Sequence, residues 1–256
     1  MITVQNVCFT LCKLLLTFVG MLNVMYPNLE CDKRFRWPSG AIICGPTMSG
    51  KSEFVFTMIR NKELIIDKPH QRIVYCYGEW QPKFDELLQE SKVEFVSGLA
   101  DVLENRDFFI SEVATLLILD DLGQSVAKDT RCTKLFTQGI HHKNVSVLLI
   151  LQNLYKQGPS MRDIHLNSQY YILYKNCRDV RQVDMLAGQM GLKHLSKAYK
   201  QVTAKPYCPL IIDMKPDTPD YLRVRTHVLP TDEYMHIYTD PDRSAFPKSC
   251  RSEFRG

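Results

Sequence analysis

Eight consecutive residues near the start of the chain have the types and spacing that bind a polyphosphate. They fit the pattern G-x-x-x-x-G-K-[ST] at every position. The residues are Gly45, Pro46, Thr47, Met48, Ser49, Gly50, Lys51 and Ser52. The glycines let backbone N–H groups point inward at phosphate oxygens, Lys51 can reach the β- and γ-phosphates, and the Ser52 hydroxyl can ligate Mg²⁺. The pattern therefore predicts a binding site for ATP and Mg²⁺.

A phosphate loop that hydrolyses ATP also needs a second metal ligand and a base. The run TLLILDDL, residues 115–122, predicts a buried strand that ends in two aspartates. Because ligands collect at the carboxyl ends of strands in open α/β sheets, we expect Asp120 beside the loop on the Mg²⁺ side and Asp121 as the base that activates water. The alternative is a strand that ends in a turn with two solvated aspartates.

A third apolar run, VSVLLILQN over residues 145–153, places the amide of Gln152 at its end. If this strand neighbours the other two, Gln152 lies next to the γ-phosphate, where it can hold water or sense the loss of that phosphate. The alternative is an amide that caps a turn.

The elements that position these residues alternate along the chain. Strands are predicted over residues 41–44, 72–77, 93–96, 115–122, 145–153, 169–175, 209–214 and 221–228. Helices are predicted over residues 50–61, from Pro82 onward, and over 99–109, 130–142, 180–190 and 192–202. Alternation with near-continuous apolar strands predicts an α/β fold with a mostly parallel central sheet and helices on both faces. A strand between the phosphate loop and the aspartate strand is typical of the additional-strand (ASCE) class of P-loop NTPase.

Composition limits the remaining possibilities. The chain is 45% hydrophobic and 23% charged, which supports a packed core, and its net charge of +4 is compatible with a nucleic-acid partner. Nine cysteines without a C-x-x-C pair argue against zinc and indicate a reducing, intracellular compartment. The apolar segment 7–26 is interrupted by Lys13 and follows no basic segment, so we expect a packing helix or an extension rather than a membrane anchor. We predict an N-terminal extension (1–35), a P-loop ATPase domain (36–230) and a C-terminal tail (231–256).

The sequence resembles the viral genome-packaging ATPases of the FtsK–HerA superfamily, in particular those of Polinton/Maverick elements and adintoviruses, and more distantly the poxvirus packaging ATPase. The resemblance covers about residues 38–230 and rests on the blocks GPTMSGKS, YCYGEWQPKF, LLILDDL, HHKNVSVLLILQNLY, LNSQYYILYKNCRDVRQV and AYKQVTAKPYCPLIIDMKPDTPDYLRVRT. It implies a homo-oligomeric ring that uses ATP to translocate double-stranded DNA into a capsid, with a capsid or portal protein as a further partner. Such a protein works in the host nucleus or cytoplasm, or in the virion.

The resemblance also implies a cation supplied by the neighbouring subunit, just upstream of the strand that ends in the glutamine. Here that residue is Lys143, where the superfamily has arginine, and Arg131 or Arg162 could take its place. Asp121 stands where the superfamily often has glutamate. The loop 154–166, with Lys156, Arg162 and His165, could face a central DNA channel.

Two other functions stay open at this level. The loop GPTMSGKS is also close to that of thymidine kinases, but the chain lacks the paired zinc-binding cysteines of those enzymes and an arginine-rich substrate lid. A nucleotide-binding remnant, or an interaction module without turnover, would keep the fold and lose hydrolysis.

Overall fold

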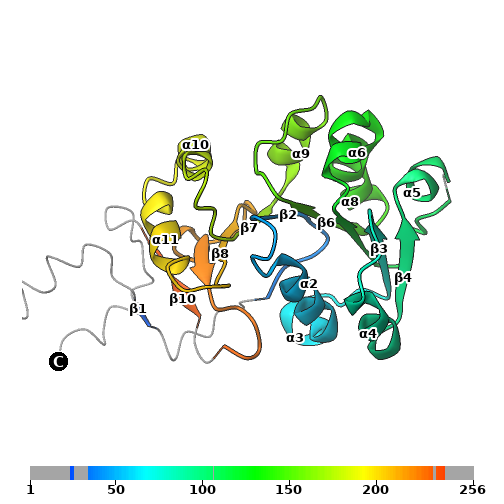
Figure 1. The fold of residues 1–256 in the computed structure, drawn as a ribbon, viewed down its shortest axis with the longest axis horizontal. Helices are drawn as coiled ribbons and strands as arrows, with labels where there is room; N and C mark the ends of the chain where they lie inside the picture. The colour runs from blue at the N-terminus through cyan, green and yellow to red at the C-terminus, as the bar shows by residue number, and fades with distance from the viewer. Residues whose placement is uncertain (1–23, 26–33, 106, 233–234, 240–256) are drawn as a thin grey trace, which may run out of the picture.

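The computed structural model describes residues 24–25, 34–105, 107–232 and 235–239, which form a sheet with helices on both faces (Figure 1). Most of the apolar segment 7–26 and most of the tail after residue 231 lie outside these residues. None of the described helices is long and apolar enough to cross a membrane.

Among the described residues, ten strands pair in the order β1-β10-β9-β8-β7-β2-β6-β5-β3-β4. Six of them are parallel: β2 (Gly40–Cys44), β3 (Arg72–Tyr77), β4 (Val93–Ser97), β5 (Thr115–Asp120), β6 (Val145–Leu151) and β7 (Tyr170–Leu173). Four extend the sheet with antiparallel pairing: β8 (Leu210–Asp213), β9 (Val224–Thr226), β10 (His236–Ile237) and β1 (Val24–Met25). The mostly parallel α/β sheet predicted from the sequence is confirmed. The last two strands lie outside the range 36–230 and complete the edge of the same sheet.

The position of β6 defines the class of the sheet. It pairs with β2, which leads into the phosphate loop, on one side and with β5, which ends in the aspartates, on the other. An additional strand therefore separates these two strands, as the ASCE class requires.

The central strands are buried on both faces because helices cover both. Helices α2 (Lys51–Arg60), α3 (Lys62–Ile65) and α4 (Lys83–Glu90) cover one face (Figure 1). The other face carries α5 (Ala100–Glu104), α6 (Gly123–Lys128), α9 (Met161–Asn167), α10 (Arg181–Met190) and α11 (Leu195–Val202). Ile43, Ile118 and Ile150 pack in the first core, whereas Ile42 and Leu149 pack in the second. This alternation explains why the strands read as unbroken apolar runs.

Three predicted elements differ in detail. The helix predicted over 99–109 ends at Glu104, because Asn105 adopts an extended conformation and its Oδ1 accepts a hydrogen bond from the Asp107 N–H. The helix predicted over 130–142 contains a π-helical turn: α7 (Thr130–Lys134), η1 (Leu135–Gly139) and α8 (Ile140–His142). The strand predicted over 221–228 is reduced to β9, because a 3₁₀ turn, η2 (Asp220–Leu222), precedes it.

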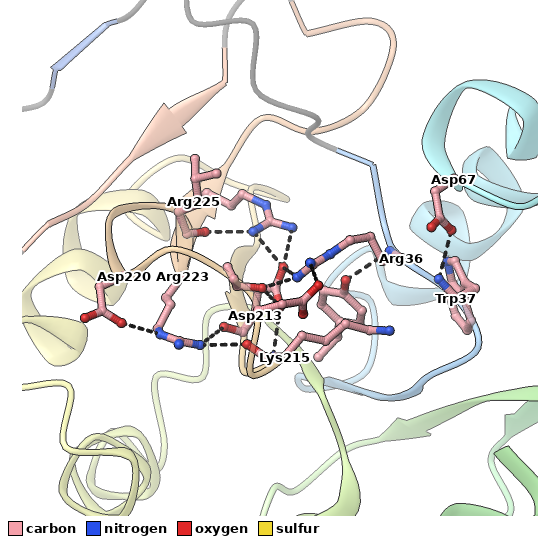
Figure 2. Close-up of polar contacts among 12 residues, drawn as sticks. Arg36, Trp37, Asp67, Asp213, Lys215, Asp220, Arg223 and Arg225 are labelled. Atoms are coloured by element: carbon pink, nitrogen blue, oxygen red, sulfur yellow. Dashed lines mark hydrogen bonds and ion pairs between the residues drawn. The ribbon is translucent and has the colours of Figure 1, made fainter. Parts of the chain in front are cut away.

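A polar cluster joins the antiparallel extension to the segment before β2 (Figure 2). Arg225 donates two hydrogen bonds of 3.1 Å to Asp213, and each of these side chains is 3% exposed. Arg36 lies 3.7 Å from the same carboxylate, bonds to Asp217 and Thr218, and donates its backbone N–H to the Tyr170 hydroxyl at 3.0 Å. Removal of one partner of a buried ion pair typically costs about 3–5 kcal/mol. The cluster therefore holds β8 and β9 in a fixed position relative to β2 and β7.

Candidate functional site

The loop between β2 and α2 has the backbone conformation that its glycines predict. Gly50 has a φ of 100° and Met48 a φ of 62°, and the Ser49 N–H bonds to the Pro46 carbonyl at 3.3 Å. A Cβ on Gly45 would lie 2.6 Å from the Tyr174 Cβ, so no larger residue fits there without a shift of the backbone. The loop thus leads directly into the amino end of α2, where backbone N–H groups favour an anion.

Lys51 lies at the first position of α2 and is directed back at its own loop. Its Nζ donates hydrogen bonds of 2.7 Å to the carbonyl oxygens of Gly45 and Pro46, and the residue is 8% exposed. Burial lowers the pKa of the ammonium group, whereas Cys44 and then Asp120 and Asp121 raise it. The two carbonyl oxygens therefore hold the Lys51 ammonium group at the opening of the loop.

Asp120 ends β5 in a buried environment. Its Oδ2 accepts a hydrogen bond of 2.6 Å from the Tyr75 hydroxyl, and the residue is 6% exposed. Burial raises the pKa of Asp120 above its usual range, and the Tyr75 hydrogen bond opposes that rise. Burial also raises the pKa of Tyr75 far above its usual value, so the hydroxyl keeps its proton and can donate this hydrogen bond. Asp120 is therefore a fixed carboxylate suited to a hard cation.

Asp121 has a different environment from its neighbour. It is exposed and has a φ of 56°, which turns the chain out of the strand. The Nε2 atom of Gln152 lies 3.5 Å from the Asp121 Oδ1. An accessible carboxylate and an amide this close together can both contact one water molecule, which is the arrangement that a water-activating pair needs.

The loop residues and the side chains at the ends of β5 and β6 line one cleft of about 1130 Å³. Its lining includes residues 47–52 of the loop together with Asp120, Asp121 and Gln152. The structure therefore brings Lys51, Ser52 and the three strand-end side chains to one place. Lys143, Arg131 and Arg162 do not line this cleft.

Lys143 lies between α8 and β6, at the amino end of a strand that runs parallel to β2, so it lies at the edge of the sheet away from the phosphate loop. Arg131 bonds to Asp129, with its Nη2 2.7 Å from Oδ2. Arg162 is exposed on α9. The role of one of these cations in a neighbouring subunit stays a prediction.

The loop after β6 places two of its basic side chains, Lys156 and His165, in different surroundings. Lys156 lines the cleft, where its side chain lies over Gly123 at the start of α6. His165 packs within its own chain: its Nε2 donates a hydrogen bond to the Leu154 carbonyl at 2.7 Å, and its ring stacks between those of Tyr155 and Tyr171. Burial lowers the pKa of His165, which keeps the ring neutral and unsuited to a phosphate contact.

Sequence reasoning missed Tyr75 and assigned Lys156 to a different surface. Tyr75 is 45 residues from Asp120 in the chain, and only the parallel pairing of β3 with β5 brings the two together. The available signal was a tyrosine inside an otherwise apolar strand next to an acidic one. For Lys156, the signal was a lysine four residues after the strand-end glutamine.

The fold is that of the P-loop ATPases: a mostly parallel sheet with an additional strand, a phosphate loop and strand-end carboxylates around one cleft. No family model and no curated protein matches the sequence. Solved structures with this fold include the genome packaging NTPase B204 of Sulfolobus turreted icosahedral virus 2 in complex with AMPPCP. The TM-score is 0.51 at 14% identity, over 74% of this chain and 96% of that one.

Two other structures show the same fold. The DNA-packaging ATPase B204 of Sulfolobus turreted icosahedral virus has a TM-score of 0.51 at 12% identity, over 74% of this chain and 96% of that one. The cytoplasmic domain of the type VII secretion ATPase EccC of Thermomonospora curvata has a TM-score of 0.50 at 12% identity, over 78% of this chain and 25% of that one. At this identity the likeness establishes the fold.

Proposed function

We propose that this chain is an ATP-hydrolysing motor that translocates double-stranded DNA, of the genome-packaging type found in the FtsK–HerA superfamily. The observation that carries the proposal is the convergence of Lys51, Ser52, Asp120, Asp121 and Gln152 on one cleft. A remnant without turnover would be free to lose any of these five side chains.

The residues divide the chemistry among them. The loop amides and the Lys51 ammonium bind the phosphates. The Ser52 hydroxyl and the Asp120 carboxylate are hard oxygen donors, a set that fits Mg²⁺. When bound, Mg²⁺ supplies positive charge that offsets the negative charge on the phosphate oxygens.

Hydrolysis then requires a positioned water molecule. Gln152 orients the water, and Asp121 accepts its proton as the water oxygen bonds to the γ-phosphorus, while the bond from the γ-phosphorus to the bridging oxygen breaks and ADP leaves. Negative charge on the transferring group is stabilised by Lys51, by Lys156 at the same cleft, and by one of Lys143, Arg131 or Arg162 from the next subunit. A cation from the next subunit requires an assembly of several copies, and we propose that this assembly is a homo-oligomeric ring.

DNA packaging rests on the sequence blocks after Gln152 and on the shared fold of packaging and secretion ATPases. We propose double-stranded DNA as the substrate of translocation, a capsid or portal protein as the docking partner, and the Polinton/adintovirus type as the relatives. The protein would act inside the host cell or the virion.

A phosphate-release assay tests the proposal, run with and without double-stranded DNA and alongside particle sizing. We expect ATPase activity that rises with DNA in a ring-sized particle, falls steeply with salt, and is lost in Lys51→Ala. Lys92→Ala, an exposed lysine away from the cleft, is the matched control and should keep the parent rate. Parent protein that releases no phosphate under any of these conditions would point to the remnant.

A further inference from the structure

The end of the cleft away from the aspartates presents an exposed aromatic ring. Tyr207 is 73% exposed and has a φ of 60°, a conformation that tyrosine rarely adopts. A Cβ on Gly50 would lie 3.4 Å from the Tyr207 Cδ1, so the ring stands next to the glycine that precedes Lys51. A strained, exposed aromatic residue beside a phosphate loop is placed to meet a ligand.

Apolar residues line the same part of the cleft as this ring. Phe54, Pro209 and Leu229 line the same cleft as Tyr207, and a smaller cavity of about 130 Å³ adjoins them. The cleft therefore has two chemically different ends: carboxylates and an amide over β5 and β6, and an aromatic and aliphatic surface at the loop before β8. The phosphate loop lies between the two ends, because β2 separates β6 from β7.

This order fixes the direction in which a bound nucleotide must lie. The terminal phosphate and its metal belong beside Asp120 and Gln152, so the rest of the molecule leaves the loop on the opposite side, toward β7 and β8. We propose that Tyr207 is the stacking platform for the nucleotide base, and that Pro209 and Leu229 contact the base or ribose beside it. The proposal rests on the ATP-binding function above and assigns its specificity-determining surface.

The platform is held in place by the fold. Leu210, three residues on, begins β8 and pairs with Leu173, the last residue of β7. The other end of β8 is Asp213, which the buried Arg225 and the nearby Arg36 hold (Figure 2). The loop that carries Tyr207 therefore leads into a strand anchored at both ends, and a loop with an anchored backbone loses less conformational freedom when a base stacks on its side chain.

The test compares ATP with inorganic tripolyphosphate, which has the phosphates and lacks the base. Stacking of a base on an aromatic side chain corresponds to roughly a 5- to 150-fold change in affinity on alanine substitution. We expect Tyr207→Ala to weaken ATP binding by that factor and to leave tripolyphosphate binding unchanged, while Tyr207→Phe binds ATP as the parent does. Leu166→Ala, which removes a side chain of a residue that is 74% exposed and outside the cleft, is the matched control.

Each outcome separates the two proposals. Lys51→Ala should weaken both ligands, because it removes a phosphate contact. If Tyr207→Ala weakens ATP and tripolyphosphate equally, or changes neither, while its melting temperature matches the parent, the platform is wrong and the phosphate site stands. If the parent binds neither ligand, the nucleotide function fails, and the platform fails with it.

Discussion

The hydrogen bond between Tyr75 and Asp120 can be tested by removal of one oxygen atom. Tyr75→Phe keeps the ring, which packs against Phe84 and Phe95, and deletes the hydroxyl that donates at 2.6 Å. A buried hydrogen bond to a charged group contributes about 1.5–3 kcal/mol, and one to a neutral group about 0.5–1.5 kcal/mol. We expect Tyr75→Phe to lose about 1.5–3 kcal/mol of unfolding free energy while Asp120 is ionised.

The dependence on pH follows from the direction of the Asp120 pKa. Burial raises that pKa and the Tyr75 hydrogen bond lowers it, so Tyr75→Phe raises it further. The loss of unfolding free energy should be full at pH values above the Asp120 pKa and should shrink as the pH falls through that pKa. The reason is that a hydrogen bond to the protonated carboxyl contributes less stability than one to the carboxylate. The acid limb of Mg²⁺ binding should move to higher pH in the variant, since the metal requires the carboxylate.

Thermal or urea unfolding with a double-mutant cycle measures the coupling. In the Asp120→Asn background, Tyr75→Phe should cost only about 0.5–1.5 kcal/mol, the neutral value. Tyr77→Phe is the matched control, because the Tyr77 ring also packs on Phe84 and its hydroxyl has no hydrogen bond within the described residues. An equal cost of Tyr75→Phe in both backgrounds, or no shift of the Mg²⁺ profile, would refute the assignment of Tyr75 as the residue that holds Asp120.

Three further tests concern the site. Lys51→Ala should abolish nucleotide binding or turnover while the fold is retained, because it removes the ammonium group that reaches the phosphates; turnover at the parent rate would contradict the phosphate-loop assignment. Asp121→Asn should bind ATP–Mg²⁺ and stall before hydrolysis, since an amide cannot accept the proton of the water. Asp120→Asn should instead lower the affinity for Mg²⁺. Equal effects of the two variants on Mg²⁺ affinity would overturn this division of roles. A mixture of Lys51→Ala with Lys143→Ala subunits should recover activity that each lacks alone, because one keeps the trans cation and the other the phosphate loop. A full rate in Lys143→Ala together with loss in Arg162→Ala would assign the site to Arg162.

The fold and the conformation of the loop between β2 and α2 can be predicted from the sequence, because each depends on local order. The strands that end in Asp120 and Gln152 are apolar along their whole length, since helices bury both faces, and such runs cannot be confused with amphipathic helices of similar length. The phosphate loop requires its glycines and lysine at fixed spacing, so its conformation follows from the eight residues alone.

The features that the sequence left hidden depend on distant pairing or on local backbone chemistry. Tyr75 meets Asp120 only through the register of β3 on β5, and no property of either segment specifies that register. The strand β10 pairs with β9 on one side. On its other side it pairs with Val24–Met25, a segment that precedes β10 by more than 200 residues in the chain. The early end of α5 depends on one Asx turn at Asn105. The role of Tyr207 could not be predicted from the sequence, because an exposed ring and a positive φ leave no periodic pattern.

Displacement of a triplex-forming third strand from a linear duplex measures directly whether ATP hydrolysis at this cleft moves the protein along double-stranded DNA, as we propose. The parent protein should displace the third strand with ATP and Mg²⁺ and should fail to do so with a non-hydrolysable analogue, and Lys51→Ala should fail with either nucleotide. Parent protein that hydrolyses ATP and leaves the third strand in place, or displacement by Lys51→Ala, would contradict the claim.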